Sequence, residues 1–78
     1  MSKEVYEINK EEIGKRLEAL RGNKTQVEVA NANGISVSAL SMYERGERIP
    51  RDEIKVRLSN YYDVSIEFIF YMNSSHVS

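Results

Sequence analysis

The apolar residues of this chain recur with the spacing of short amphipathic helices. Ile13, Leu17 and Leu20 are three or four residues apart, the interval that places side chains on one face of a helix. Outside residues 5–8, no stretch of useful length alternates apolar and polar residues as a half-buried strand would. The pattern predicts five helices, at residues 10–21, 26–33, 37–45, 52–62 and 66–71.

Residues that end helices fall between these segments. Gly22, Gly34 and Gly46 each follow a helical pattern, and glycine readily adopts the positive φ that ends a helix. Pro50 lies in the longest connection, between the third and fourth predicted helices. These signals separate the helices from one another along the chain.

Residues that cap helix N-termini precede the predicted helices. Asn9 with Glu12, and Thr25 with Glu28, have the spacing of capping boxes, in which a side chain and a backbone N–H satisfy each other in both directions. Ser36 occupies the capping position of the third helix. The starts of the helices are therefore predicted by local chemistry as well as by periodicity.

The two ends of the chain differ from its centre. Residues 1–8 are predicted to form a partly ordered N-terminal arm, with a short strand at residues 5–8 as an alternative, and residues 73–78 a flexible polar tail. Residues 9–72 contain no internal repeat and no linker. We therefore expect one compact all-α domain over residues 9–72.

Residues 26–45 predict two short helices joined by a tight turn at residues 33–35. Two helices that cross steeply approach each other most closely near the turn, where the first has the small residue Ala30. The turn itself contains Gly34, which has no Cβ to clash at positive φ. This is the layout of a helix-turn-helix.

The second helix of this unit has an inner and an outer face. Leu40 and Tyr43 can lean on the preceding helices. Apolar residues on a helix are usually core, so Val37 and Met42 could also be buried. Because Leu40 and Tyr43 already supply an inward stripe, we favour an exposed position for both. The resulting outer strip consists of Val37, Ser38, Ser41, Met42 and Arg45.

Composition excludes several kinds of site. The chain has 78 residues and no cysteine, so it can form neither a disulfide nor a thiolate metal site. Its single histidine, His76, lies in the polar tail. Because an enzyme usually needs a tuned acid, base, nucleophile or metal in a pocket, we expect no enzyme activity, no cofactor and no metal. The sequence has neither a signal-peptide layout nor a membrane-spanning apolar run, and a cytoplasmic protein is expected.

Charge is segregated along the chain although the formal net charge is only −1. Residues 1–12 are mainly acidic, whereas residues 13–24 and 45–57 are mainly basic. The distribution matters more than the sum for binding to nucleic acid. A nearly neutral protein can still present a basic face.

With these residues in view, the chain resembles the Cro/CI-type (Xre) regulators, which have the lambda-repressor-like fold. Gln26, Ala30, Gly34 and Leu40 stand at the family's spacings, followed by the run Tyr-Glu-Arg-Gly at residues 43–46. The segments that carry the resemblance are IGKRLEALR, TQVEVANANGISVSALSMYERGERIP and RDEIKVRLSNYYDVSIEFIF. It implies a five-helix domain that binds double-stranded DNA with the helix that follows Ser36.

The resemblance implies a role for individual side chains. Gln26 matches a glutamine that bonds a DNA phosphate and braces the recognition helix, and Glu44 matches a glutamate that pairs with an arginine, here Arg21. The base-reading candidates are Ser36, Val37, Ser38, Ser41 and Met42. The phosphate-contacting candidates are Lys24, Gln26, Arg45 and Arg48, with Arg51 near the same path.

Three features depart from the family pattern. The link between Arg21 and Gln26 is shorter than usual. Asn33 stands where a leucine is common, and a buried amide there needs hydrogen-bond partners. Lys55 replaces a frequent apolar residue in the fourth helix. Together they indicate a divergent member.

The last predicted helix is apolar on nearly all sides. One face can pack on the core, and the remainder would be exposed in a monomer. Family members often form dimers through this end, so we expect a homodimer. The dimerisation candidates are Ile66, Ile69, Phe70 and Met72.

Two functional hypotheses follow. The first is a dimeric transcriptional repressor of bacterial or prophage origin that binds a near-palindromic operator through residues 37–45. The alternative is a protein-interaction module of the antitoxin or antagonist type, whose apolar C-terminal end binds a regulatory protein partner. Charge reversal in the strip at residues 37–45 discriminates between them, because only the first function requires that strip.

Overall fold

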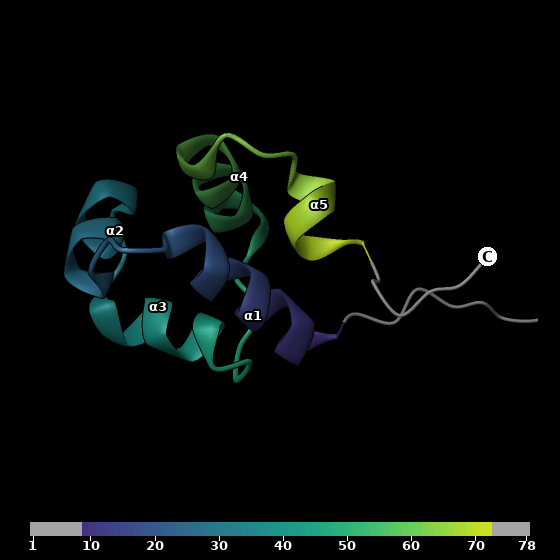
Figure 1. Cartoon of the computed structure of the whole chain (residues 1–78), viewed down its shortest axis with the longest axis horizontal. Helices are drawn as coiled ribbons and strands as arrows, with labels where there is room; N and C mark the ends of the chain where they lie inside the picture. The colour runs from purple at the N-terminus through teal and green to yellow at the C-terminus, as the bar shows by residue number, and fades with distance from the viewer. Residues whose placement is uncertain (1–8, 73–78) are drawn as a thin grey trace, which may run out of the picture.

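The computed structural model describes residues 9–72, which fold into five helices packed around one core (Figure 1). The helices are α1 (Lys10–Arg21), α2 (Gln26–Asn33), α3 (Val37–Glu44), α4 (Asp52–Tyr62) and α5 (Ile66–Phe70). Residues 9–72 contain no strand. The predicted all-α class and the five helices are therefore confirmed. The predicted arm at residues 1–8, the tail at residues 73–78 and His76 lie outside the described residues.

Two helix ends differ slightly from the prediction. Arg45 and Tyr71 were expected to be the last residues of their helices, but they are the residues that follow α3 and α5. The N–H of Arg45 still bonds the carbonyl oxygen of Ser41 at 2.9 Å, and Gly46 then turns the chain at a φ of +75°. The chain turns at Gly46, so α3 ends at Glu44, one residue before the end that the apolar and polar pattern predicts.

Asn9 caps α1 with its side chain, and Thr25 forms the predicted capping box of α2 with Glu28. The Asn9 side chain accepts from the N–H of Glu12 at 3.1 Å. The Thr25 hydroxyl accepts from the N–H of Glu28 at 3.0 Å, and the Glu28 carboxylate accepts in return from the N–H of Thr25. Each such cap satisfies N–H groups that the helix cannot pair internally. The helix starts are correspondingly those predicted.

The core receives side chains from every helix. Leu17 of α1, Leu40 of α3 and Leu58 of α4 have no exposed surface. The fully or nearly fully buried apolar side chains are Ile13, Leu17, Val29, Ala30, Leu40, Tyr43, Ile54, Leu58, Ile69 and Phe70. Since a small domain has little surface to bury, this cluster supplies most of the driving force for folding.

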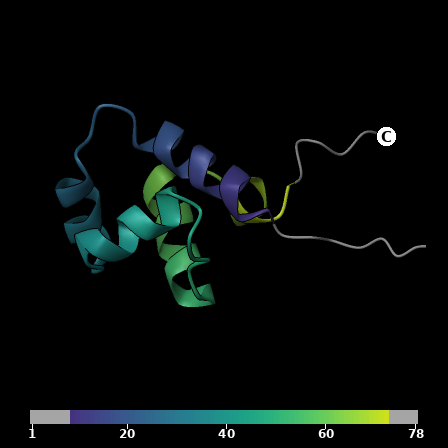
Figure 2. The same cartoon turned by 90° about the horizontal axis from the view of Figure 1, so that it is seen from below.

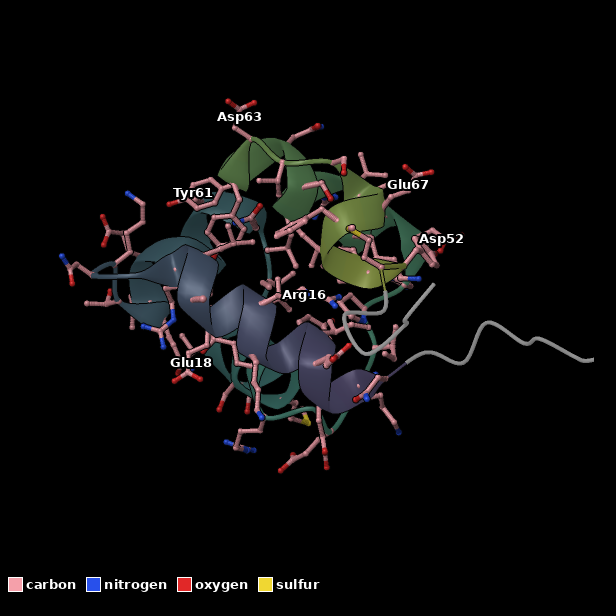
Figure 3. All side chains as sticks on the ribbon, turned by 45° about the vertical axis from the view of Figure 1, so that its right-hand side comes forward. Arg16, Glu18, Asp52, Tyr61, Asp63 and Glu67 are labelled. Carbon is pink, nitrogen blue, oxygen red and sulfur yellow. The ribbon has the colours of Figure 1, made fainter. Side chains whose placement is uncertain are left out.

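The helices are arranged so that α2 and α3 lie together at one end of the molecule and α5 at the other, with α1 spanning the distance between them (Figures 1 and 2). Arg16 points from α1 towards α5, where its Nη1 donates to the carbonyl oxygen of Ile69 at 3.0 Å (Figure 3). The α2–α3 pair is thus held apart from the apolar C-terminal helix. Within residues 9–72, every helix is too short or too polar to cross a lipid bilayer.

Two of the residues that depart from the family pattern are buried and have partners. The Asn33 amide donates from Nδ2 to the carbonyl oxygen of Val29 at 2.8 Å. Lys55 Nζ donates to the Tyr71 hydroxyl at 2.7 Å and lies 4.7 Å from the centre of the Tyr71 ring. Hydrogen bonds and a cation–π contact therefore compensate both polar groups for the loss of water.

Candidate nucleic-acid interface

The turn between α2 and α3 is built around Ala30 and Gly34. Ala30 has no exposed surface, and its carbonyl oxygen accepts from the N–H of Ile35 at 3.0 Å. Gly34 has a φ of +68° and a ψ of +33°, the left-handed conformation that costs glycine least. Ser36 then opens α3, with its hydroxyl accepting from the N–H of Ala39 at 3.0 Å. The chain forms the helix-turn-helix that its sequence predicts.

The outer face of α3 is open to solvent. Leu40, Tyr43 and Glu44 face the interior. On the opposite face Val37 is 38% exposed and Ser38 is also exposed. Ser41 and Met42 are half-buried, and Arg45 is exposed. Neither Val37 nor Met42 belongs to the core, so the strip presents its side chains outwards.

Glu44 anchors α3 from the inside. Its Oε2 accepts from Nε of Arg21 at 2.8 Å, and its Oε1 accepts from Nη2 of Arg21 at 3.0 Å. The Gln26 amide donates from Nε2 to the same Oε1 at 3.0 Å. The hydrogen bonds that Arg21 donates to Glu44 raise the pKa of the Arg21 guanidinium. One carboxylate thereby joins the end of α1, the start of α2 and the end of α3.

The short link between α1 and α2 is compatible with this network. Arg21 Nη1 donates to the carbonyl oxygen of Lys24 at 2.8 Å, so the same guanidinium closes the link and binds Glu44. This contact draws the backbone at Lys24 towards the end of α1. The side chain of Gln26, which starts α2, braces Glu44 as the family pattern implies.

Exposed cationic side chains stand in the two connections that precede and follow the α2–α3 unit and at the end of α3. Arg48 and Arg51, in the α3–α4 connection, are exposed and line a groove of about 630 Å³ together with Ser36 at the start of α3. Lys24 is exposed in the α1–α2 link. Arg45, at the end of α3, donates to the Glu47 carboxylate and to the Ser41 hydroxyl.

The geometry agrees with a comparison of the whole chain with known protein families. The helix-turn-helix family model matches residues 13–69, well over half of the chain. The chain belongs to the Cro/CI-type (Xre) helix-turn-helix family. No curated protein matches it. This Xre-type chain is accordingly a DNA-binding regulator in class, and the match includes every residue of the outer strip.

One prediction about the Xre-type domain needs correction. Ile69 and Phe70 were expected at a dimer interface, but they are 0% and 2% exposed and belong to the core. Of the other two candidates, Ile66 is half-buried and Met72 is 56% exposed. The sequence pattern failed here because a helix that is apolar on all sides does not indicate which face turns inwards.

The surface residues that the sequence pattern missed lie next to those it found. Phe68 and Tyr71 are 42% and 50% exposed at the C-terminal end of the domain. Glu47, which was given no role, binds Arg45 at the end of α3. The available signal was the arrangement Arg45-Gly46-Glu47, in which a glycine turn can bring the two opposite charges together.

Proposed function

We propose that this Xre-type chain is a sequence-specific transcriptional repressor that binds a near-palindromic operator as a homodimer. In this function α3 enters the major groove of double-stranded DNA. The observation that carries the proposal is the pairing of an outward strip on α3 with an inner face fixed by Glu44. A rigid helix can present side chains to base edges without first having to become ordered.

Base recognition would depend on apolar contacts and hydroxyl groups. The strip offers Val37 and Met42 to thymine methyl groups and Ser38 to either base type. Ser36 and Ser41 are the remaining base-reading candidates, although each hydroxyl already accepts one hydrogen bond within the protein. Asn, Gln, Arg and Lys, which make bidentate base contacts, are missing from positions 37–42. Sequence-dependent deformability of the DNA would therefore contribute to specificity.

Phosphate contacts would flank the strip. Lys24 and Gln26 precede α3 in the chain and Arg48 follows it, and each would supply hydrogen-bond donors to the backbone of the DNA. Arg45 and Arg51 complete the set. Such contacts fix the register of a protein on the duplex, whereas the base contacts specify the sequence.

Dimerisation would use the apolar surface that the core leaves uncovered at the C-terminal end. Phe68, Tyr71 and Met72 are each more than 40% exposed, and the half-buried Ile66 lies on the same helix as Phe68. A symmetric pair places two recognition helices about 34 Å apart, one turn of DNA. Light scattering at high micromolar concentration should give the mass of a dimer, and Phe68→Ser should shift it towards the monomer. A monomeric mass of the unchanged protein contradicts this part of the proposal.

Selection from random-sequence duplexes tests the proposed function. The full chain should enrich a near-palindromic site, and its affinity should fall with salt by about 0.9 log units per log unit of salt for each phosphate neutralised. Val37→Ala should weaken binding most at sites that contain thymine. Val56→Ala is the matched control, because this valine is 49% exposed on α4 rather than on the strip. An unchanged base preference in Val37→Ala would contradict the proposed readout.

A second candidate function is supported by the exposed apolar end of the domain. Phe68, Tyr71 and Met72 would suit a heterologous protein partner, as in an antitoxin or an antagonist. The charge reversal Arg45→Glu, combined with Ser41→Glu, separates the two functions. It should abolish operator binding if the chain is a repressor, and leave binding of a protein partner intact if the second candidate is correct.

A further inference from the structure

Each nitrogen of the Arg45 guanidinium donates one hydrogen bond in the described structure, which uses three of its five N–H groups. Its Nε donates to Oε2 of Glu47 at 3.0 Å, its Nη2 donates to Oε1 of Glu47 at 3.1 Å, and its Nη1 donates to the Ser41 hydroxyl. Both charged side chains are nevertheless more than half exposed, at 57% and 52%. The ion pair therefore lies on the exposed surface at the C-terminal end of the outer strip.

The backbone holds Glu47 beside α3. The N–H of Glu47 donates to the carbonyl oxygen of Met42 at 2.9 Å, which folds the chain back over the last turn of the helix. Gly46 makes this reversal at a φ of +75°, and a Cβ there would lie 3.0 Å from Cα of Glu11 at the start of α1. The turn is thus packed against α1, which holds the backbone of Glu47 beside the last turn of α3.

A carboxylate and a DNA phosphate bind an arginine in the same way. Each accepts two parallel hydrogen bonds from the planar fork of the guanidinium. Arg45 therefore has to leave Glu47 before it can bind a phosphate with Nε and Nη2.

We propose that Glu47 attenuates the affinity of this domain for DNA by holding Arg45 in an intramolecular ion pair that competes with a DNA phosphate for the Nε and Nη2 edge of the guanidinium. The inference rests on the proposed function, since it requires the end of α3 to meet DNA. Non-specific binding is almost entirely electrostatic, so Glu47 weakens attachment to random sequence. The net charge of −1 also weakens electrostatic attachment to random-sequence DNA. Binding then relies more on the contacts that read bases.

The test compares the affinities of four proteins for one random-sequence duplex. They are the unchanged chain, Glu47→Gln, Arg45→Gln and the double variant. Each is measured by fluorescence anisotropy between about 50 and 200 mM salt, a range over which phosphate contacts change affinity strongly. Glu47→Gln should bind more tightly by up to roughly fivefold, because an exposed ion pair is a weak competitor. The slope of log affinity against log salt concentration should be steeper by about 0.9 for Glu47→Gln, the value for one additional neutralised phosphate.

The double variant decides whether Glu47 acts through Arg45. If it does, Glu47→Gln produces no gain when Arg45 is already Gln. A gain that persists in the Arg45→Gln background overturns the proposal, because Glu47 would then repel phosphate directly. Glu67→Gln on α5 is the matched control, since it makes the same charge change at an exposed position outside the α3–α4 connection. An equal gain in Glu67→Gln also overturns the proposal.

The outcomes for the two proposals differ. If the unchanged chain enriches an operator but Glu47→Gln binds random duplex no more tightly, attenuation is wrong and the repressor function stands. If Glu47→Gln gains affinity through Arg45 but no variant prefers any sequence, attenuation stands and sequence-specific repression is wrong. Failure of every protein to bind any duplex overturns both.

Discussion

Arg21 and Glu44, one at the end of α1 and the other at the end of α3, are joined by two parallel hydrogen bonds of 2.8 and 3.0 Å. The Glu44 side chain is only 4% exposed and that of Arg21 is 18% exposed. A buried carboxylate needs a partner, because its own interactions with water are lost. The Arg21–Glu44 pair therefore holds the end of α3 against the end of α1.

Removing Arg21 should destabilise the domain. In Arg21→Met the Glu44 carboxylate keeps its bond from Gln26 but loses its counter-charge, and we expect the free energy of unfolding to fall by about 2–3 kcal/mol. Urea denaturation followed by circular dichroism measures the change. Arg48→Met is the control, because it removes an exposed arginine from a connection. Equal free energies of unfolding for Arg21→Met and Arg48→Met would show that the Arg21–Glu44 pair does not contribute to stability.

Gly14 is predicted to tolerate no side chain. A Cβ at this position in α1 would meet the carbonyl oxygen of Glu44 and lie 3.0 Å from the backbone nitrogen of Gly46. Alanine favours a helix by about 0.5–1 kcal/mol over glycine, but the backbone clash should outweigh this gain. Gly14→Ala should therefore lower the free energy of unfolding by about 1–3 kcal/mol, measured by urea denaturation. A more stable Gly14→Ala variant would mean that α1 and α3 can move apart freely.

Contacts between residues close in the sequence could be predicted, whereas contacts between distant elements could not. Helix starts depend on contacts over three or four residues, so the caps at Asn9 and Thr25 were visible in the sequence. The close approach at Gly14 joins α1 to the end of α3 and has no local signal. The partner that compensates Lys55 was equally hidden, since Tyr71 comes from another helix end.

The candidate interface could be predicted to a similar extent. The outer strip follows from helical spacing, and Val37 is accordingly exposed. The inward direction of Ile69 and Phe70 could not be read from a helix that is apolar on all sides. The Arg45–Glu47 pair depends on a backbone reversal at Gly46, which the spacing of apolar residues does not describe.

Lys55→Met should leave stability unchanged or raise it. The ammonium is buried in α4, and burial of a charge opposes folding even where a hydrogen bond and aromatic rings compensate it. Its removal leaves the Tyr71 hydroxyl and the 96% exposed Asp52 carboxylate free to bind water. The midpoint of thermal unfolding, compared with that of Lys15→Met at an exposed site on α1, measures the effect. A loss of more than about 2 kcal/mol would instead make the Lys55–Tyr71 contact a major source of stability.

Tyr62 is predicted to make stability depend on pH in the alkaline range. Burial, reinforced by the nearby Glu44 carboxylate, raises the pKa of its hydroxyl to about 12, whereas an unfolded tyrosine ionises near 10. The folded state therefore holds this proton more tightly than the unfolded state. The resulting stabilisation is fully present below pH 10 and is lost as the pH rises from about 10 through about 12.

Tyr62→Phe isolates this contribution. Its hydroxyl is buried without a hydrogen-bond partner among the described residues, so its removal at neutral pH should leave stability unchanged or raise it by up to about 1 kcal/mol. Above pH 10 the variant should gain stability relative to the unchanged protein, because only the latter has this tyrosine to ionise on unfolding. Urea denaturation at pH 8 and pH 11 measures the difference, with Tyr61→Phe as control because the rings of the two tyrosines are in contact. If the advantage of Tyr62→Phe is the same at both pH values, ionisation of Tyr62 is not linked to folding.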